Sequence, residues 1–155
     1  MKNYISYLLI MMLIATASCK NAEKKQDSKE ANKVKNVILL IGDGMGLSQL
    51  YAGYIASHQN LFITRAKYIG MQKTNSTDDL ITDSAASGTA LATGTKTNNG
   101  MIGVAPDSSI LTSILELAEN KGLATGLVST SSITHATPAA FIAHQASRNM
   151  YEEIA

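Results

Sequence analysis

The apolar positions of this chain fall into short unbroken runs and into longer segments with helical spacing. Residues 37–41 read Val-Ile-Leu-Leu-Ile, an apolar run of strand length with no polar residue inside it. Such a run is typical of a strand buried on both faces, as in a parallel sheet covered by helices. Residues 68–71 and 124–128 are predicted to be two more short strands. Strands that alternate with helices predict an α/β fold of three layers around a largely parallel central sheet.

Two segments around these strands have helical spacing. Between residues 47 and 55, Leu, Tyr and Ile recur at intervals that place them on one face of a helix. Residues 110–120 give a second amphipathic pattern, with an N-cap at Ser108 or Ser109 and an end at Gly122. We expect both helices to bury their apolar faces.

A third helix is predicted over residues 84–93, a run of small residues that ends at Gly94. Ser84 would stand at its N-terminus, where free backbone N–H groups and the helix dipole favour an anion. A serine hydroxyl beside a bound anion is the arrangement that a nucleophile for phosphate chemistry needs. In the alternative interpretation, Asp83 or Ser84 is only the N-cap of the helix.

The N-terminal residues have the pattern of an export signal. Lys2 precedes a mostly apolar run, residues 4–17. That run is short for a membrane span, which needs about 20 apolar residues, and it suits a signal peptide. Residues 16–19, Thr-Ala-Ser-Cys, resemble the lipobox of bacterial lipoproteins, and cleavage after Ala17 is the alternative. We therefore expect residues 1–19 to be a signal peptide, and the protein to be exported to the periplasm or anchored in the outer membrane by a lipid on Cys19.

The charge of the chain is unevenly distributed. Residues 20–35 carry six lysines against three acidic residues and almost no large apolar residue. This composition predicts a disordered tether. Residues 36–155 carry six basic against nine acidic residues and are predicted to form the folded domain. A net charge of +1 gives no reason to expect nucleic-acid binding.

Asp43 is the first candidate for a ligand-binding residue. It lies in the sequence Gly-Asp-Gly-Met-Gly of residues 42–46, directly after the first predicted strand. The carboxyl ends of parallel strands are where open α/β sheets bind ligands. The Asp43 carboxylate therefore suits a metal ion, although an ordinary turn aspartate fits the same pattern.

Further candidates follow the strand predicted at 124–128. The polar loop 129–137 presents His135 and Thr137, a neutral nitrogen donor and a neutral oxygen donor. Arg148 offers a planar guanidinium that can hold two phosphate oxygens. A loop histidine and a solvated arginine are the alternative interpretations of these residues taken singly.

Taken together, these stretches resemble alkaline phosphatases. The resemblance covers residue 36 to the C-terminus in the order of the family, and it rests on residues 41–46 (Ile-Gly-Asp-Gly-Met-Gly), 82–90 (Thr-Asp-Ser-Ala-Ala-Ser-Gly-Thr-Ala), 135–138 (His-Ala-Thr-Pro) and 143–148. It implies an alkaline-phosphatase-like fold, of which residues 36–155 would be the N-terminal, incomplete portion.

The resemblance also implies roles for the phosphate-handling residues. Ser84 matches the nucleophile that becomes phosphoserine. Arg148 matches the arginine that clamps phosphate oxygens, and Asp83 the carboxylate that orients this arginine. A serine without a histidine base needs a Lewis acid to lower its pKa.

Metal cofactors follow from the same resemblance, which implies two zinc ions and one magnesium ion. Asp43 matches a carboxylate shared between a zinc and the magnesium, Thr137 matches a magnesium ligand, and His135 matches a position that tunes the magnesium site. The other ligands of the family come from well downstream of these motifs. His58 and His144 do not complete the set, and we assign His144 as a structural partner.

Three functions are compatible with these residues. The first is metal-dependent hydrolysis of phosphate monoesters through a phosphoserine at Ser84, in a complete enzyme that the resemblance implies to be a homodimer. The second is a related phosphodiesterase or sulfatase, although Asp-Ser-Ala at residues 83–85 argues against typical sulfatases. The third is a truncated, inactive lipoprotein that only binds a cation or phosphate.

Overall fold

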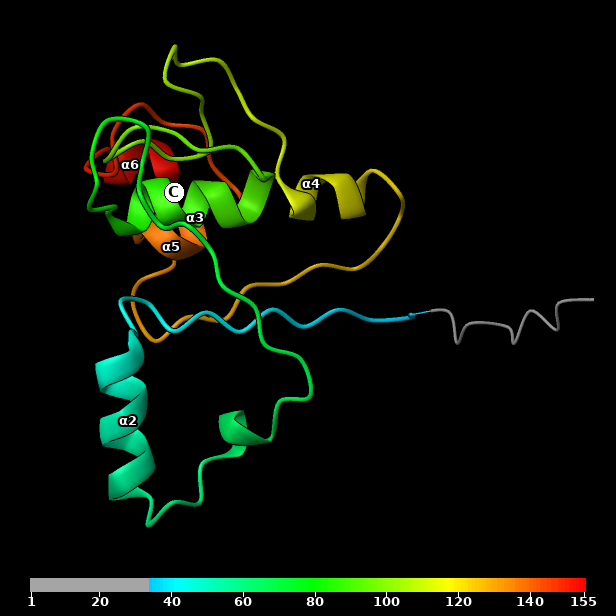
Figure 1. Cartoon of the computed structure of the whole chain (residues 1–155). Coiled ribbons are helices and arrows are strands. Elements are labelled where there is room, and N and C mark those ends of the chain that lie inside the picture. The colour runs from blue at the N-terminus through cyan, green and yellow to red at the C-terminus, as the bar shows by residue number, and fades with distance from the viewer. Residues whose placement is uncertain (1–33) are drawn as a thin grey trace, which may run out of the picture. The chain divides into compact units, whose positions relative to one another are not determined.

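The computed structural model describes residues 34–155, which divide into two units, residues 34–39 and residues 40–155. The predicted signal peptide (1–19) and nearly all of the predicted tether (20–35) lie outside the described residues. In the second unit, the helical elements in chain order are α2 (Leu47–Ala56), η2 (Phe62–Arg65), α3 (Ser84–Thr93), α4 (Ile114–Glu119), α5 (Ala136–Ala139) and α6 (Tyr151–Ile154) (Figure 1). Within residues 34–155, no helix combines the length and apolarity that crossing a membrane requires.

Helix α3 begins and ends where the sequence predicts. Asp83 is its N-cap, and its carboxylate accepts a hydrogen bond from the backbone N–H of Ala86 at 2.9 Å. Gly94 ends the helix in the left-handed conformation, with φ of 75°. Because a side chain strains that conformation, glycine is the favoured residue at this position.

Helix α3 packs closely against α5, which lies beside it in Figure 1. The contact depends on small residues: a Cβ atom added to Gly88 would lie 3.1 Å from the Cβ of Ala140 and 3.4 Å from the Cα of Thr137. Ala85 and Ala139 are fully buried in the same contact region. The absence of a side chain at Gly88 therefore lets α5, and Thr137 with it, approach the helix that begins at Ser84.

The segment 100–104 joins α3 to the C-terminal part of the chain. Ile102 is fully buried, and its backbone forms an antiparallel bridge with Gln145. The hydroxyl of Thr89 on α3, also fully buried, accepts the N–H of Gly103 at 2.9 Å and donates to the carbonyl of Met101 at 3.2 Å. The core is a cluster of small and branched residues from these segments: Ala85, Ile102, Ala136, Ala139, Ala143 and Ile154.

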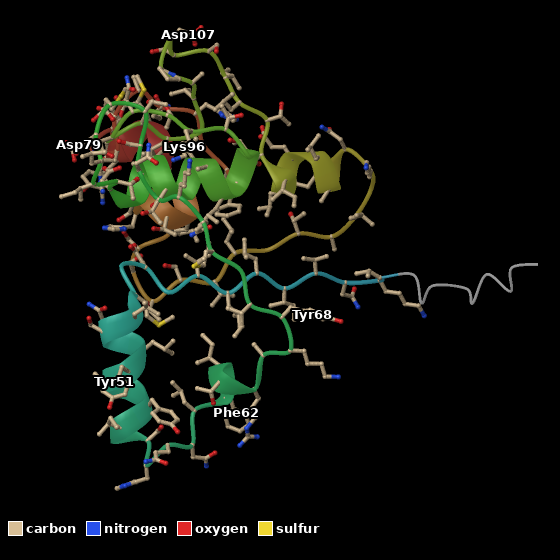
Figure 2. All side chains as sticks on the ribbon, in the orientation of Figure 1. Tyr51, Phe62, Tyr68, Asp79, Lys96 and Asp107 are labelled. Atoms are coloured by element: carbon tan, nitrogen blue, oxygen red, sulfur yellow. The ribbon has the colours of Figure 1, made fainter. Side chains whose placement is uncertain are left out.

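The predicted central sheet does not form within residues 34–155. The predicted strands at 37–41, 68–71 and 124–128 have no regular structure, and apart from two isolated bridges no strand pairing occurs in this range. Their apolar side chains are exposed, with Tyr68 at 93% (Figure 2) and Val128 at 102%. The physical reason is that a strand is stabilised by neighbouring strands, and these runs have none in the described chain.

Helix α2 confirms the helix predicted after Gly46, but not its buried face. No residue of α2 is buried, and Leu47 and Tyr51 are 85% and 66% exposed (Figure 2). The apolar face of an amphipathic helix in a globular protein normally packs against another element. Its apolar residues lack such a cover for the same reason that the strands lack partners.

The predicted N-cap of the helix at 110–120 is wrong. Helix α4 begins at Ile114 and is capped by Ser113, not by Ser108 or Ser109. Ser113 and Glu116 form a capping box, in which the Ser113 N–H donates to the Glu116 carboxylate at 2.7 Å and the Glu116 N–H donates to the Ser113 hydroxyl at 3.2 Å. This reciprocal pair outcompetes a start at residue 110.

We predict that Ser113→Ala lowers the free energy of unfolding by about 1–3 kcal/mol, because it removes the cap and the bond from the Ser113 hydroxyl to the Phe141 carbonyl (2.8 Å). Urea unfolding followed by circular dichroism measures the change. Ser109→Ala is the control and should change stability by less than about 0.5 kcal/mol. Equal losses in the two variants would contradict the assignment of Ser113 as the cap.

Candidate active site at the start of α3

The Asp83 carboxylate connects three parts of the candidate site. One oxygen caps α3, and the other accepts the N–H of Gly100 at 3.0 Å and the Nη1–H of Arg148 at 3.1 Å. The backbone of Arg148 is fixed as well, because its N–H donates to the Gly100 carbonyl at 2.7 Å. The structure thus brings Arg148, 65 residues away in sequence, to the N-terminal end of α3.

These contacts set the charge state of Asp83. Burial of the carboxylate favours its neutral form, but the backbone N–H groups of Ala86 and Gly100 and the guanidinium of Arg148 outweigh this effect and lower the pKa of Asp83. Only Nη1 of Arg148 bonds to Asp83. Within the described chain, the other guanidinium N–H groups have no recorded acceptor, so they are available to an anion.

Ser84 is the first residue of α3, and its surroundings suit an anion. Among residues 34–155, no acceptor is recorded for the backbone N–H groups of Ser84 and Ala85, which point out of the helix N-terminus. The Ser84 hydroxyl lies 3.4 Å from Oδ1 of Asp43, at the outer limit of a hydrogen bond. Ala85 is fully buried, so an anion at this end would meet the Ser84 N–H, the Ser84 hydroxyl and the helix dipole.

Asp43 and Thr137 meet beside Ser84. The Thr137 hydroxyl donates to Oδ2 of Asp43 at 2.9 Å, across 94 residues of sequence. The close packing of α5 on α3 brings Thr137 to this place. His135, the N-cap residue of α5, is half-buried, and its ring makes no recorded hydrogen bond in the described structure. The structure thus places the six site residues predicted from sequence in two separate groups of side-chain contacts, with His135 outside both. These groups are the pair Asp83–Arg148 and the trio Ser84, Asp43 and Thr137.

The donors in this site fit part of a metal centre. A carboxylate and a hydroxyl, both oxygen donors, converge at Asp43 and Thr137, which suits a hard cation such as Mg²⁺. Zinc sites in enzymes usually use three protein ligands. Within residues 34–155, no cluster of three or more His, Cys, Asp or Glu side chains could hold a metal ion. The described residues therefore provide the start of a metal centre and not a closed zinc site.

Asn99 was missed by the sequence analysis. Its side-chain oxygen accepts the N–H of Asp83 at 2.9 Å, and its amide nitrogen donates to the Ile81 carbonyl at 2.9 Å. These two bonds fix the approach to Ser84 from one side. The Asn-Asn-Gly sequence of residues 98–100 signals a turn, but it does not reveal what the side chain contacts.

A serine at a helix N-terminus, facing an arginine–aspartate pair and a carboxylate, is the kind of site that phosphate-ester hydrolases use. A sequence model of the alkaline phosphatase family matches residues 34–155. The chain belongs to the alkaline phosphatase family.

Individual relatives agree with this assignment. Alkaline phosphatase 4 of Bacillus subtilis is 45% identical over 145 residues, which cover 88% of this chain and 31% of the relative. The solved alkaline phosphatase of the Antarctic bacterium TAB5 is 50% identical, with a TM-score of 0.75, over 77% of this chain and 35% of that one. A variant of the TAB5 enzyme with Mg bound in its M3 site is 49% identical, with a TM-score of 0.75, over 77% and 34% of the two chains.

The structural likeness shows that residues 34–155 have an alkaline-phosphatase-like fold. The chain spans about a third of the length of the relatives that it matches.

We predict that Asp83→Asn destabilises the protein in a pH-dependent manner. Asparagine still caps a helix but loses the charge that pairs with Arg148, so the free energy of unfolding at pH 7 should fall by about 1 kcal/mol, a low value because the pair is partly exposed. The pKa of Asp83 is lower in the folded than in the unfolded state. Its contribution is therefore present above about pH 3.9 and is lost as the pH falls through the folded-state pKa.

Urea unfolding at several values between pH 7 and pH 3 measures this difference, which should shrink at the acidic end. Asp79→Asn is the matched control, because Asp79 is an exposed carboxylate nearby that makes no ion pair in the described structure. A destabilisation by Asp83→Asn that is constant over this pH range would show that the charge of Asp83 has no part in it.

Proposed function

We propose that these residues form the nucleophile and phosphate-binding half of a metal-dependent phosphomonoesterase that works through a phosphoserine at Ser84. The observation that carries the proposal is the position of Ser84, which is the first residue of α3 and lies beside Asp43. The Asp83–Arg148 pair lies at the same helix end. Family membership supports a phosphate monoester as the substrate, rather than a diester or a sulfate.

The residues of this chain bind and orient the phosphate. The backbone N–H of Ser84 and the Arg148 N–H groups that bond to no acceptor within residues 34–155 hold its non-bridging oxygens. The Ser84 hydroxyl loses its proton to solvent, its oxygen forms a bond to phosphorus as the bond from phosphorus to the alcohol oxygen breaks, and the released alcohol oxygen takes up a proton from solvent. Water then cleaves the phosphoserine and releases inorganic phosphate. Asp83 takes no part in bond changes and keeps Arg148 in position.

Metal ions would supply the Lewis acid that lowers the pKa of the Ser84 hydroxyl and stabilises the leaving oxygen. We assign Asp43 and Thr137 as ligands of this centre, and His135 as a residue that tunes it from the start of α5. Two zinc ions and one magnesium ion are the proposed complement. A histidine-to-aspartate variant of the TAB5 enzyme holds Mg in its M3 site, and the oxygen donors of Asp43 and Thr137 in this chain suit the same cation.

Cellular location and assembly are proposed from sequence alone. Residues 1–19 would direct export, and Cys19 would carry a lipid that anchors the protein in the cell envelope. The complete enzyme would be a homodimer. A binding protein without activity is the alternative, and the lack of a closed zinc site within residues 34–155 favours it for these residues on their own.

We predict that a complete enzyme containing residues 34–155 is labelled at Ser84 when it is quenched in acid during turnover of a phosphate monoester. Peptide mapping by mass spectrometry locates the label. Ser84→Ala should remove the label. Ser87→Ala should keep it, because the Ser87 hydroxyl donates to the Asp83 carbonyl at 2.8 Å inside the same helix. A label on any other residue would disprove the assignment of Ser84.

We predict that Asp43→Asn lowers the content of both zinc and magnesium, because the amide keeps the size of the side chain but loses the charge that offsets a divalent cation. Elemental analysis of the purified complete enzyme measures the content. Asp107→Asn is the control, since Asp107 lies in an exposed loop and bonds only to Ser109. Unchanged metal content in Asp43→Asn would identify Asp43 as an ordinary turn residue.

A further inference from the structure

His144 forms a second polar cluster next to the candidate site. Its Nδ1 lies 2.8 Å from the Gly103 carbonyl oxygen, and its Nε2 lies 3.0 Å from Oε1 of Glu116. The ring therefore joins three segments, namely residues 143–148, residues 100–104 and the first turn of α4. None of the proposed catalytic steps uses this cluster.

Both neighbours of the His144 ring are hydrogen-bond acceptors. A neutral imidazole has one N–H and one acceptor nitrogen, so it can satisfy only one of them. Two good bonds require both nitrogens to carry protons, which makes the ring a cation beside the Glu116 carboxylate. Burial of the ring opposes protonation, but the bonds to Gly103 and Glu116 and the charge of Glu116 outweigh it and raise the pKa of His144.

The backbone beside the ring is built for this contact. Gly103 has φ of 59°, and an added Cβ would overlap the Ala143 carbonyl oxygen and lie 2.8 Å from Nδ1 of His144. Only glycine lets the two segments approach so closely. The other acceptor is fixed as well, because Oε2 of Glu116 belongs to the capping box of α4.

Segments 100–104 and 143–148 also position Arg148, the proposed phosphate clamp. Ile102 and Gln145 exchange backbone bonds of 2.9 and 2.8 Å, and the N–H of Arg148 donates to the Gly100 carbonyl. The N–H of Gly100 in turn bonds to Asp83. Segment 100–103 is thus held at one end by Asp83 and at the other by His144, and Arg148 is aligned on it.

We propose that protonated His144, paired with Glu116, is a positioning residue that holds segments 100–104 and 143–148 together and thereby keeps Arg148 in place to bind the phosphate group. When the His144 ring loses its second proton, one of its nitrogens becomes an acceptor that faces the acceptor oxygen of Gly103 or Glu116. That hydrogen bond is lost, and segment 100–104 is held less firmly. The inference rests on the proposed role of Arg148. It gives the anion site a dependence on pH at neutral to alkaline values, a range that the lowered pKa of Asp83 leaves behind.

The charged groups around the ring are few. Glu116 is the only carboxylate in ion-pair contact with His144 within residues 34–155. Helices α3 and α5 and segment 100–104 contain no titratable side chain, while α6 carries Glu152 and Glu153, both exposed. The pair should be complete between about pH 4.3 and pH 6.5, the ordinary pKa values of the two groups. It should weaken as the pH rises through the raised pKa of His144.

The test uses sulfate as the probe, because this tetrahedral dianion keeps its charge where phosphate titrates. Nuclear magnetic resonance follows the amide shifts of Ser84 and Ala85 to give the sulfate Kd of the full chain between pH 5.5 and pH 9. A His135→Asn background removes the other histidine near the site. In the same samples, ¹⁵N signals of the His144 ring give its pKa and show whether both nitrogens are protonated.

We expect the sulfate Kd to rise about threefold to tenfold as His144 loses its proton. His144→Gln should bind sulfate at every pH as weakly as the unchanged chain does after His144 has lost its proton. Glu116→Gln keeps the capping box through its amide oxygen, and its amide N–H can donate to Nε2 of a neutral His144, so the rise in Kd should be lost. Glu119→Gln, an equal change of charge on the same helix, should leave the curve unchanged. In an Arg148→Ala background, His144→Gln should have no further effect.

The outcomes separate this inference from the proposed function. If Arg148→Ala binds sulfate as tightly as the unchanged chain, the phosphate clamp itself is wrong. If Arg148→Ala weakens binding while His144→Gln and pH do not, the clamp stands and the role of His144 is overturned. A singly protonated His144 ring at pH 6 would also overturn it, and this measurement does not depend on any variant folding.

Discussion

The rest of the described structure depends on one half-buried carboxylate, that of Asp83. It caps the N-terminus of α3, accepts a hydrogen bond from the backbone of segment 100–104 and pairs with Arg148. The three bonds span increasing distances in sequence. The bond from Ala86 is local, the bond from Gly100 joins a loop to the helix, and the bond from Arg148 joins residues 65 positions apart. A single charge can do this because an ionised carboxylate accepts several hydrogen bonds, each stronger than a bond between neutral groups.

The second constraint is the space between α3 and α5. Alanine and glycine face each other there, and Gly88 leaves no room for a side chain. Small residues contribute little apolar area, so this contact gains stability from close packing more than from the amount of surface that it buries. Its functional consequence is geometric. The hydroxyl of Thr137 reaches the carboxylate of Asp43 only because the helices are this close.

Features that depend on neighbouring residues could be predicted from the sequence. Both ends of α3 follow from Asp83 and Gly94, and the pairing of Arg148 with Asp83 agrees with the family resemblance. Features that depend on distant partners could not. The apolar run at 37–41 specifies a buried strand, but a strand becomes ordered only when another strand pairs with it. The N-cap of α4 was misplaced because Ser109 and Ser113 are both adequate caps, and only the reciprocal bonds with Glu116 decide between them.

The two halves of the candidate site differ in how their chemistry is assembled. The proposed anion site needs only a backbone N–H and one arginine held by an aspartate, and all of them are in place within residues 83–148. A cation needs several charged side chains at one point, and such a set costs free energy through mutual repulsion until the metal binds. Within the described residues, Asp43 has a hydroxyl beside it and belongs to no group of three or more His, Cys, Asp or Glu side chains that could hold a metal ion. The described chain therefore orders the proposed anion site by itself, whereas the proposed metal centre requires further ligands before Ser84 could act as the proposed nucleophile.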